Sequence, residues 1–170
     1  MDSIEILAID PGNTESGYVI IDGPTRKPIE VGKIPNEQLL DRLIEWLGGG
    51  EGGDHVAIEM VASYGMAVGK EVFETCVWIG RFAQAVDSFG AFKMPCDLTY
   101  RRDVKLHLCG TSKAKDANIT QALIDRFASG QPNRGKGTKA DPGWFYGFKA
   151  DIWQAYALAV LIADTAKDAA

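Results

Sequence analysis

The stretch that decides the fold is Ile4-Glu-Ile-Leu-Ala-Ile-Asp10-Pro-Gly-Asn-Thr-Glu-Ser-Gly-Tyr-Val-Ile-Ile-Asp22. Apolar runs stand on both sides of a Pro-Gly-Asn turn, a pattern that predicts a β-hairpin whose second strand covers residues 17–22. Asp10 stands where the first strand runs into the turn. Burying a carboxylate there is costly unless it is paired or binds a metal ion. In the alternative interpretation, Asp10 only caps its own turn through a side-chain hydrogen bond.

Beyond the hairpin, the sequence alternates between strand and helix patterns. A helix that starts at Asn36 carries leucines at helical spacing and ends in a glycine-rich connector over residues 48–53. Val-Ala-Ile-Glu59 ends a later strand in a carboxylate, as Asp10 ends the first strand. The other expected elements are a strand over 29–34, a strand over 55–59, a helix over 68–88, a strand over 91–94, a short helix capped by Thr99, a helix opened by Ser112 or Asp116, a loop over 131–147 and a helix over 150–166.

This order of elements predicts an α/β fold. Three strands joined by short turns, followed by β-α-β units, give a mixed five-stranded sheet with helices on both faces. The first strand is expected in the centre, with the fourth strand parallel to it through the first helix as crossover. Asp10 and Glu59 would then lie at neighbouring strand ends, where ligands of open α/β sheets gather. The 170 residues fit a single domain over residues 1–170.

The composition is typical of an ordinary globular protein. Hydrophobic residues make up 46% of the chain and charged residues 24%, which argues against disorder. No apolar run is long enough to cross a membrane and no secretory signal precedes the first strand, so we expect a cytoplasmic protein. The three cysteines lie far apart without a CxxC pair, which indicates neither a disulfide framework nor a zinc site.

The charge is unevenly distributed along the chain. The formal net charge of −5 argues against a polyanionic partner, since phosphate contacts rely on lysine and arginine. Two segments nevertheless hold many basic and few acidic residues, and they are candidates for phosphate contacts. Their basic residues are Lys93, Arg101, Arg102, Lys105, Lys113 and Lys115 in the first segment, and Arg134, Lys136, Lys139 and Lys149 in the second. The alternative is that these are solvated helix faces balanced by acids elsewhere.

Asp151 adds a third acid at the start of the last predicted helix. Three carboxylates that converge on one place repel one another unless cations lie between them. Oxygen ligands favour Mg²⁺, for which Mn²⁺ can substitute. Two such ions, about 3.5–4 Å apart, can hold both the attacking water and the leaving oxygen of a phosphodiester.

Four sequence blocks follow one another along the chain: Ala-Ile-Asp10-Pro-Gly-Asn-Thr-Glu-Ser-Gly-Tyr, Val-Ala-Ile-Glu59, Gly110-Thr-Ser-Lys113-Ala-Lys115-Asp-Ala-Asn-Ile and Asp151-Ile-Trp-Gln-Ala-Tyr-Ala-Leu-Ala. In this order they resemble the ribonuclease H-like superfamily. Within it the chain is similar to the RuvC family of Holliday junction resolvases, in particular the versions carried by bacteriophages and prophages. The resemblance implies a Mg²⁺-dependent, structure-selective endonuclease that resolves Holliday junctions or other branched DNA, a crossover junction endodeoxyribonuclease.

The resemblance also implies roles for single residues. Asp10 would bridge both ions, and Glu59 and Asp151 would each help to hold one. Lys113 or Lys115 would stabilise charge near the scissile phosphate, with plain backbone contact as the alternative. One departure concerns the last helix: the family has a second aspartate where this chain has Gln154, a weaker ligand that can still reach a metal through its carbonyl oxygen or a water.

A second departure concerns DNA contacts. The bacterial enzymes of the family carry an aromatic residue three positions after the catalytic glutamate, where this chain has Ala62. Tyr64, or Met60 and Met66, can take over stacking, although packing of Tyr64 into the core is the favoured interpretation. The aromatic run 144–148 either stacks on unpaired bases or forms a hydrophobic plug under the last helix. The expected DNA-binding residues are Tyr64, Arg101, Arg102, Lys105, Lys113, Lys115, Lys139 and Lys149.

The expected partners are branched DNA and a second copy of the chain. In the resembled family the helix that corresponds to residues 68–88 builds a homodimer, and two symmetric cuts call for a two-fold enzyme. Burial of that helix within one chain is the alternative.

Three other functions compete with junction cleavage. A nuclease of the same fold could act on RNA/DNA hybrids or precursor ribosomal RNA, and Gln154 makes a non-catalytic DNA-binding relative conceivable. Sugar kinases and actin-like ATPases open with a similar Asp-x-Gly strand and turn, but they need a second lobe, for which 170 residues leave no room.

Overall fold

One mixed sheet forms the centre of the molecule. The computed structural model describes residues 4–49, 55–90 and 94–168. Its 5-stranded sheet has the order β3-β2-β1-β4-β5. The strands are β1 (Glu5–Asp10), β2 (Glu15–Asp22), β3 (Pro28–Pro35), β4 (His55–Met60) and β5 (Cys96–Tyr100). The helices are α1 (Asn36–Gly48), α2 (Lys70–Phe89), α3 (Arg101–Cys109), α4 (Asp116–Phe127), the 3₁₀ helix η1 (Pro132–Gly135) and α5 (Ile152–Asp168).

The strand directions agree with the sequence prediction. β1 lies in the middle, antiparallel to β2 and parallel to β4, and β2 pairs antiparallel with β3. In this register Asp10 lies opposite Gly17 of β2, and Ile9 lies beside Ile58 of β4. Asp10 follows Ile9 and Glu59 follows Ile58, so the two acids lie side by side at the end of the sheet where β1, β4 and β5 all end.

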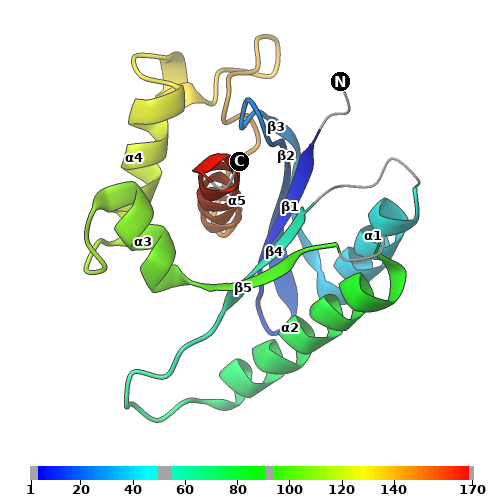
Figure 1. Cartoon of the computed structure of the whole chain (residues 1–170). Coiled ribbons are helices and arrows are strands. Elements are labelled where there is room, and N and C mark those ends of the chain that lie inside the picture. Colours follow the sequence, from blue (N-terminus) through cyan, green and yellow to red (C-terminus); the bar gives the residue numbers. More distant parts are fainter. Residues whose placement is uncertain (1–3, 50–54, 91–93, 169–170) are drawn as a thin grey trace.

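Both faces of the sheet are covered by helices, as Figure 1 shows. Alternate residues of β1 point to opposite faces, because successive side chains of a strand do so. Ile6 and Ala8 join the core under α3, α4 and α5, whereas Leu7 and Ile9 join the core under α1 and α2. The mixed sheet with helices on both faces is confirmed, and burial on both faces explains why the hairpin strands are almost continuously apolar.

The fifth strand differs from the prediction. It was expected over residues 91–94, of which 91–93 lie outside the described residues, and the structure has it at Cys96–Tyr100. Thr99, the expected helix cap, lies inside β5, and α3 begins only at Arg101. β5 is an edge strand whose side chains are half-buried or exposed, so its sequence carries no clear apolar alternation. Its parallel pairing with Val56–Met60 of β4 fixes its position instead.

The aromatic run 144–148 is mainly a structural plug. Phe145 and Phe148 are 0% and 2% exposed and pack edge-on against Tyr156 of α5. The indole N–H of Trp144 donates to the Tyr156 hydroxyl at 2.9 Å. Only Tyr146, which is 45% exposed, faces solvent. This outcome confirms the hydrophobic-plug interpretation for most of the run.

α2 turns most of its expected apolar face to the core, with two exceptions. Ile79, Phe82 and Val86 are buried, as the helix lies against the sheet. Phe73 and Gly80 were expected on the same apolar face, but Phe73 is 62% exposed and Gly80 lies at the surface. Val77 is also 63% exposed. The helix itself is confirmed, and it carries apolar side chains that nothing in the described parts of this chain covers.

A cluster of charges on the far part of α5, here called the Asp164 hub, joins four segments of the chain. Its carboxylate accepts hydrogen bonds from Arg26 at 2.9 Å, His107 at 2.8 Å and Arg126 at 2.7 Å. Burial alone raises the pKa of the Asp164 carboxyl, but these hydrogen bonds, led by that of Arg126, hold it well below its usual range. The hub ties the β2–β3 connection, α3 and α4 to α5.

Within residues 4–49, 55–90 and 94–168, none of the helices combines the length and hydropathy that crossing a bilayer requires.

Candidate functional site

Two buried carboxylates stand at neighbouring strand ends. Asp10 closes β1, and only 11% of its side chain is exposed. Glu59 lies near the end of β4, and its side chain is 13% exposed. The parallel register of the two strands, which runs through Ile9 beside Ile58, brings these acids to the same place. The adjacency expected from the order of the elements is therefore present.

Arg101 lies between the two acids. Its Nε lies 2.8 Å from Glu59 Oε1, and its Nη2 lies 3.3 Å from Glu59 Oε2 and 3.5 Å from Asp10 Oδ2. Its Nη1 lies 3.4 Å from Asp116 Oδ2. Arg101 is the first residue of α3, directly after β5, so the edge strand delivers a guanidinium to the acidic end of the sheet.

The site holds more negative charge than Arg101 compensates. Burial and the charge of Glu59 raise the pKa of the Asp10 carboxyl to about 8, with smaller contributions from Asp151 and Asp116, although Arg101 opposes the shift. Burial likewise raises the pKa of the Glu59 carboxyl, against the lowering effect of Arg101 and Lys105. A further cation at this place would favour the ionised form of both acids.

A contact with Gly17 brings Asp151 next to these acids. Gly17 lies opposite Asp10 in the β1–β2 register and opposite Lys33 in the β2–β3 register. A Cβ atom on Gly17 would lie 2.8 Å from both the carbonyl carbon and the Cβ of Asp151, so the segment that opens α5 rests directly on this glycine. The Asp151 carboxylate pairs with Lys33 Nζ at 2.7 Å. The third acid thus lies close enough for its charge to act on Asp10.

Gln154, the residue expected at the fourth ligand position, lies on the first turn of α5 and is 7% exposed. It is held on the same side of the sheet as Asp151, three positions further along the chain. An amide in this position can offer its carbonyl oxygen to a hard cation.

The turn that follows Asp10 is fixed by other residues. Ser16 Oγ accepts a hydrogen bond from the Gly12 N–H at 3.1 Å and donates one to Asn36 Oδ1 at 2.6 Å. Asn36 Nδ2 in turn donates to the Gly12 carbonyl at 2.9 Å. The turn therefore does not depend on Asp10 as a cap, and the capping interpretation of Asp10 is wrong.

The three acids have the chemistry to bind a divalent ion, but in this structure they are paired with basic side chains of the same protein. Among the described residues, no three His, Cys, Asp or Glu side chains are gathered as a ready metal site. Asp10 and Glu59 face Arg101, and Asp151 faces Lys33. The donors are all carboxylate oxygens, the type that Mg²⁺ and Mn²⁺ prefer, and burial together with the charge of Glu59 raises the pKa of Asp10, so a cation at this place would stabilise its ionised form.

The segment between α3 and α4 carries the two lysines of the Gly-x-x-Lys-Ala-Lys block. Lys113 and Lys115 are exposed. Asn118 Oδ1 accepts a hydrogen bond from the Lys115 N–H at 2.8 Å, which fixes the start of α4. The next residue, Asp116, contacts Arg101. Asp116 was expected only as a possible helix opener, although its place directly after the lysines was a usable signal.

The other expected DNA contacts differ in burial and in their surroundings. Tyr64 is 75% exposed, so its expected packing into the core is wrong. It borders a pocket of about 370 Å³ that is lined by Ala62, Tyr64, Tyr100, Arg102 and Asp103. Lys105 is half-buried, and its charge opposes the rise in the pKa of the Glu59 carboxyl. Lys139 and Lys149 are exposed on the segment that leads to α5.

Comparison with known proteins gives a match in fold but none in sequence. No protein family model and no curated protein matches the chain. RuvC of Thermus thermophilus has the same fold with a TM-score of 0.69 at 15% identity, covering 98% of this chain and 97% of that chain. A structure of T. thermophilus RuvC in complex with Holliday junction substrate matches with a TM-score of 0.70 at 16% identity, covering 98% and 96% of the two chains. The chain therefore has the ribonuclease H-like fold of RuvC.

Proposed function

We propose that this protein is a divalent-metal-dependent endonuclease that cuts Holliday junctions or other branched DNA, and that it is a relative of the RuvC resolvases. The observation that carries the proposal is the buried pair Asp10 and Glu59 at adjacent strand ends, with Asp151 held beside them over Gly17. Burying such a pair is costly unless cations compensate it, and the single charge of Arg101 faces two carboxylates. The fold shared with a RuvC that was solved with a Holliday junction supports the substrate class.

Asp10, Glu59 and Asp151 would hold the metal, with Gln154 as a neutral fourth donor. Asp10 would be the central acid of such a site, because the charges of both Glu59 and Asp151 act on it. Bound Mg²⁺ or Mn²⁺ neutralises charge on a phosphodiester and lowers the pKa of water, which suits phosphodiester hydrolysis. The sheet edge supplies the rigid support for these side chains, since β1 and β4 are buried on both faces.

Basic side chains near the acids would position the DNA backbone. Lys113 and Lys115 are exposed where the loop enters α4, and Lys105 is near enough to Glu59 to lower the pKa of its carboxyl. Arg102 lies one residue from Arg101 and lines the pocket that Tyr64 and Tyr100 border. Phosphate contacts of this kind position a nucleic acid without reading its sequence.

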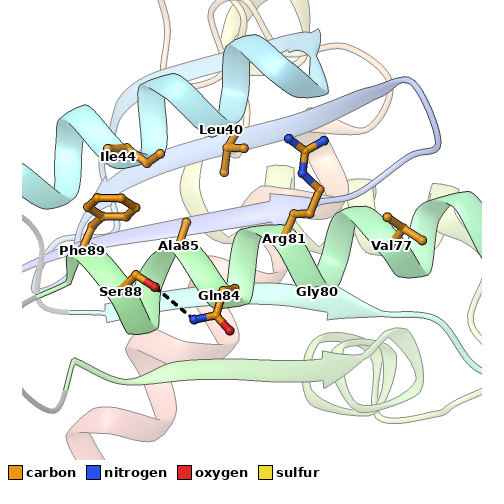
Figure 2. A pocket seen from close by; sticks show the side chains of 9 residues that line it. All are labelled: Leu40, Ile44, Val77, Gly80, Arg81, Gln84, Ala85, Ser88 and Phe89. Atoms are coloured by element: carbon orange, nitrogen blue, oxygen red, sulfur yellow. Dashed lines mark hydrogen bonds between the residues drawn. The ribbon is translucent and has the colours of Figure 1, made fainter.

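We further propose that the active form is a homodimer built on α2. A groove of about 420 Å³ lies between α1 and α2. In Figure 2, Leu40 and Ile44 of α1 border it on one side and Phe89 of α2 borders it on the other. Val77, also on this surface, is 63% exposed. A second copy of the chain is the occupant that a four-way junction calls for, because a two-fold enzyme presents two equivalent sites to two equivalent strands.

The experiment that tests the proposal compares substrates. The full-length protein is incubated in Mg²⁺ with labelled four-way junction, flap, linear duplex and RNA/DNA hybrid. We expect nicks in the branched DNA and none in the linear duplex. Preferential cleavage of the hybrid would instead support the ribonuclease H-like alternative, and junction binding without any cleavage in Mg²⁺ or Mn²⁺ would support a non-catalytic relative.

A further inference from the structure

We propose that Arg101 is a resident counter-cation of the acidic site and that it moves onto Asp116 when a divalent ion enters. This inference rests on the proposed function, because it concerns the regulation of the same site. It makes Arg101 a competitor of the metal, in contrast to the DNA-contact role expected from the sequence.

The first observation is the position of the guanidinium. It contacts carboxylates of Asp10 and Glu59 at 3.5 Å and 2.8 Å, the same acids that would ligate the metal. A divalent ion and a guanidinium cannot occupy the same space between two carboxylates. Loading the site therefore requires these contacts to break.

The second observation is that the contacts of Arg101 are poorly formed. Its Nε is buried and close to Glu59, but the N–H lacks the direction for a hydrogen bond, so this buried polar atom has no hydrogen-bond partner among the described residues. Its Nη contacts are 3.3 to 3.5 Å long. By contrast, Arg126 forms a two-pronged bond of 2.7 and 2.8 Å with Asp164. Arg101 therefore compensates charge without the geometry of a permanent structural pair.

The third observation is that a second carboxylate is already within reach. Asp116 Oδ2 lies 3.4 Å from Arg101 Nη1, and the Asp116 side chain is 56% exposed, against 13% for Glu59. Asp116 is the first residue of α4, so it stands at the outer rim of the site. A rotation of the Arg101 side chain toward this rim would keep its charge paired while freeing the two buried acids.

The test measures metal binding directly, by calorimetric titration of the full-length protein with Mn²⁺. Arg101→Gln removes the competitor, and Arg102→Gln is the matched control, because it removes the same charge from the next residue of the same helix. Asp10→Asn reports whether the heat arises at the acidic site. Thermal unfolding in the presence of a chelator shows that each variant is folded.

We expect Arg101→Gln to bind Mn²⁺ at least about tenfold more tightly than wild type, because like charges a few ångströms apart repel strongly in a half-buried site. Arg102→Gln should stay within about threefold of wild type, since its charge is exposed and screened. The gain in melting temperature on adding Mn²⁺ should also be larger for Arg101→Gln. Unchanged or weaker Mn²⁺ binding by Arg101→Gln would overturn the inference.

The transfer to Asp116 is tested with a double-mutant cycle. Asp116→Asn should weaken Mn²⁺ binding more in wild type than in the Arg101→Gln background, because only wild type needs the second carboxylate for its arginine. Equal effects in both backgrounds would overturn the transfer step. If Asp10→Asn leaves the binding heat unchanged, the metal site and with it the proposed function fail. If only the Arg101 results fail, the proposed function stands.

Discussion

The contact between Gly17 and Asp151 gives a prediction that can be worked out from distances. In Gly17→Ala, the new Cβ would lie 2.8 Å from two carbon atoms of Asp151 and 2.9 Å from its carbonyl oxygen. Carbon atoms in ordinary contact lie about 3.5–4.0 Å apart, so the start of α5 must retreat by about 0.7 Å or more. Backbone atoms make up part of this contact, so a side-chain rotation cannot relieve it.

Two effects follow from this retreat. Overpacking of this kind costs about 1–3 kcal/mol in the free energy of unfolding. Because Asp151 moves away from Asp10, the junction cleavage rate should also fall by about 10-fold to 100-fold, as for other catalytic groups displaced by about 1 Å. Urea unfolding followed by tryptophan fluorescence measures the first effect, and single-turnover cleavage of a labelled four-way junction measures the second.

Gly48→Ala is the matched control for this substitution. Gly48 ends α1, and a Cβ there meets nothing within 4 Å. We expect wild-type cleavage and a stability within about 1 kcal/mol of wild type, because alanine suits a helix better than glycine. If Gly17→Ala behaves like Gly48→Ala in both assays, then Gly17 does not set the position of Asp151 and the reasoning is refuted.

Three further predictions concern stability, assembly and metal binding. Asp164→Asn should lower the free energy of unfolding at pH 7 by about 3 kcal/mol, because it breaks the ion pairs of the Asp164 hub. The lowered pKa of Asp164 means that this stabilisation is present above the ordinary pKa and is lost in acid, so the urea midpoints of variant and wild type should converge below about pH 4, and equal midpoints at pH 7 would contradict the hub's role. Val77→Glu should convert a dimer into a folded monomer in sedimentation velocity, whereas an unchanged dimer would place the interface elsewhere. Gln154→Asp should tighten Mn²⁺ binding about tenfold in calorimetry by adding a charged oxygen donor, and unchanged binding would show that Gln154 faces away from the metal.

The central pair of acids could be predicted from the sequence because local patterns determine it. Asp10 and Glu59 each end an apolar run, and a single crossover helix between the runs makes the strands parallel neighbours. The carboxyl ends of β1 and β4, and with them Asp10 and Glu59, therefore lie next to each other. β5 was misplaced because an edge strand with exposed side chains lacks a periodic pattern, and only its pairing with β4 fixes it.

The partners of the acids could not be predicted in the same way. Arg101 was grouped with the exposed basic residues because the distribution of charge along the chain does not show where a side chain points. Its position at the junction of β5 and α3 places its side chain against Glu59. Lys33 can pair with Asp151 because the registers of β1 with β2 and of β2 with β3 align it with Gly17 and Asp10. The sequence does not determine these two registers. Tyr64 was expected in the core, yet it lies in the exposed segment between β4 and α2.

The most direct test of the account is the cleavage of a four-way junction labelled on each strand, by wild type and by Asp10→Asn in Mg²⁺. The account predicts that wild type nicks two opposing strands at symmetric positions and that Asp10→Asn remains folded, still binds the junction and leaves every strand intact. Cleavage that persists in Asp10→Asn, or a wild type that cuts no strand in either Mg²⁺ or Mn²⁺, would contradict the claim that this acidic site is the catalytic centre of a junction-resolving nuclease.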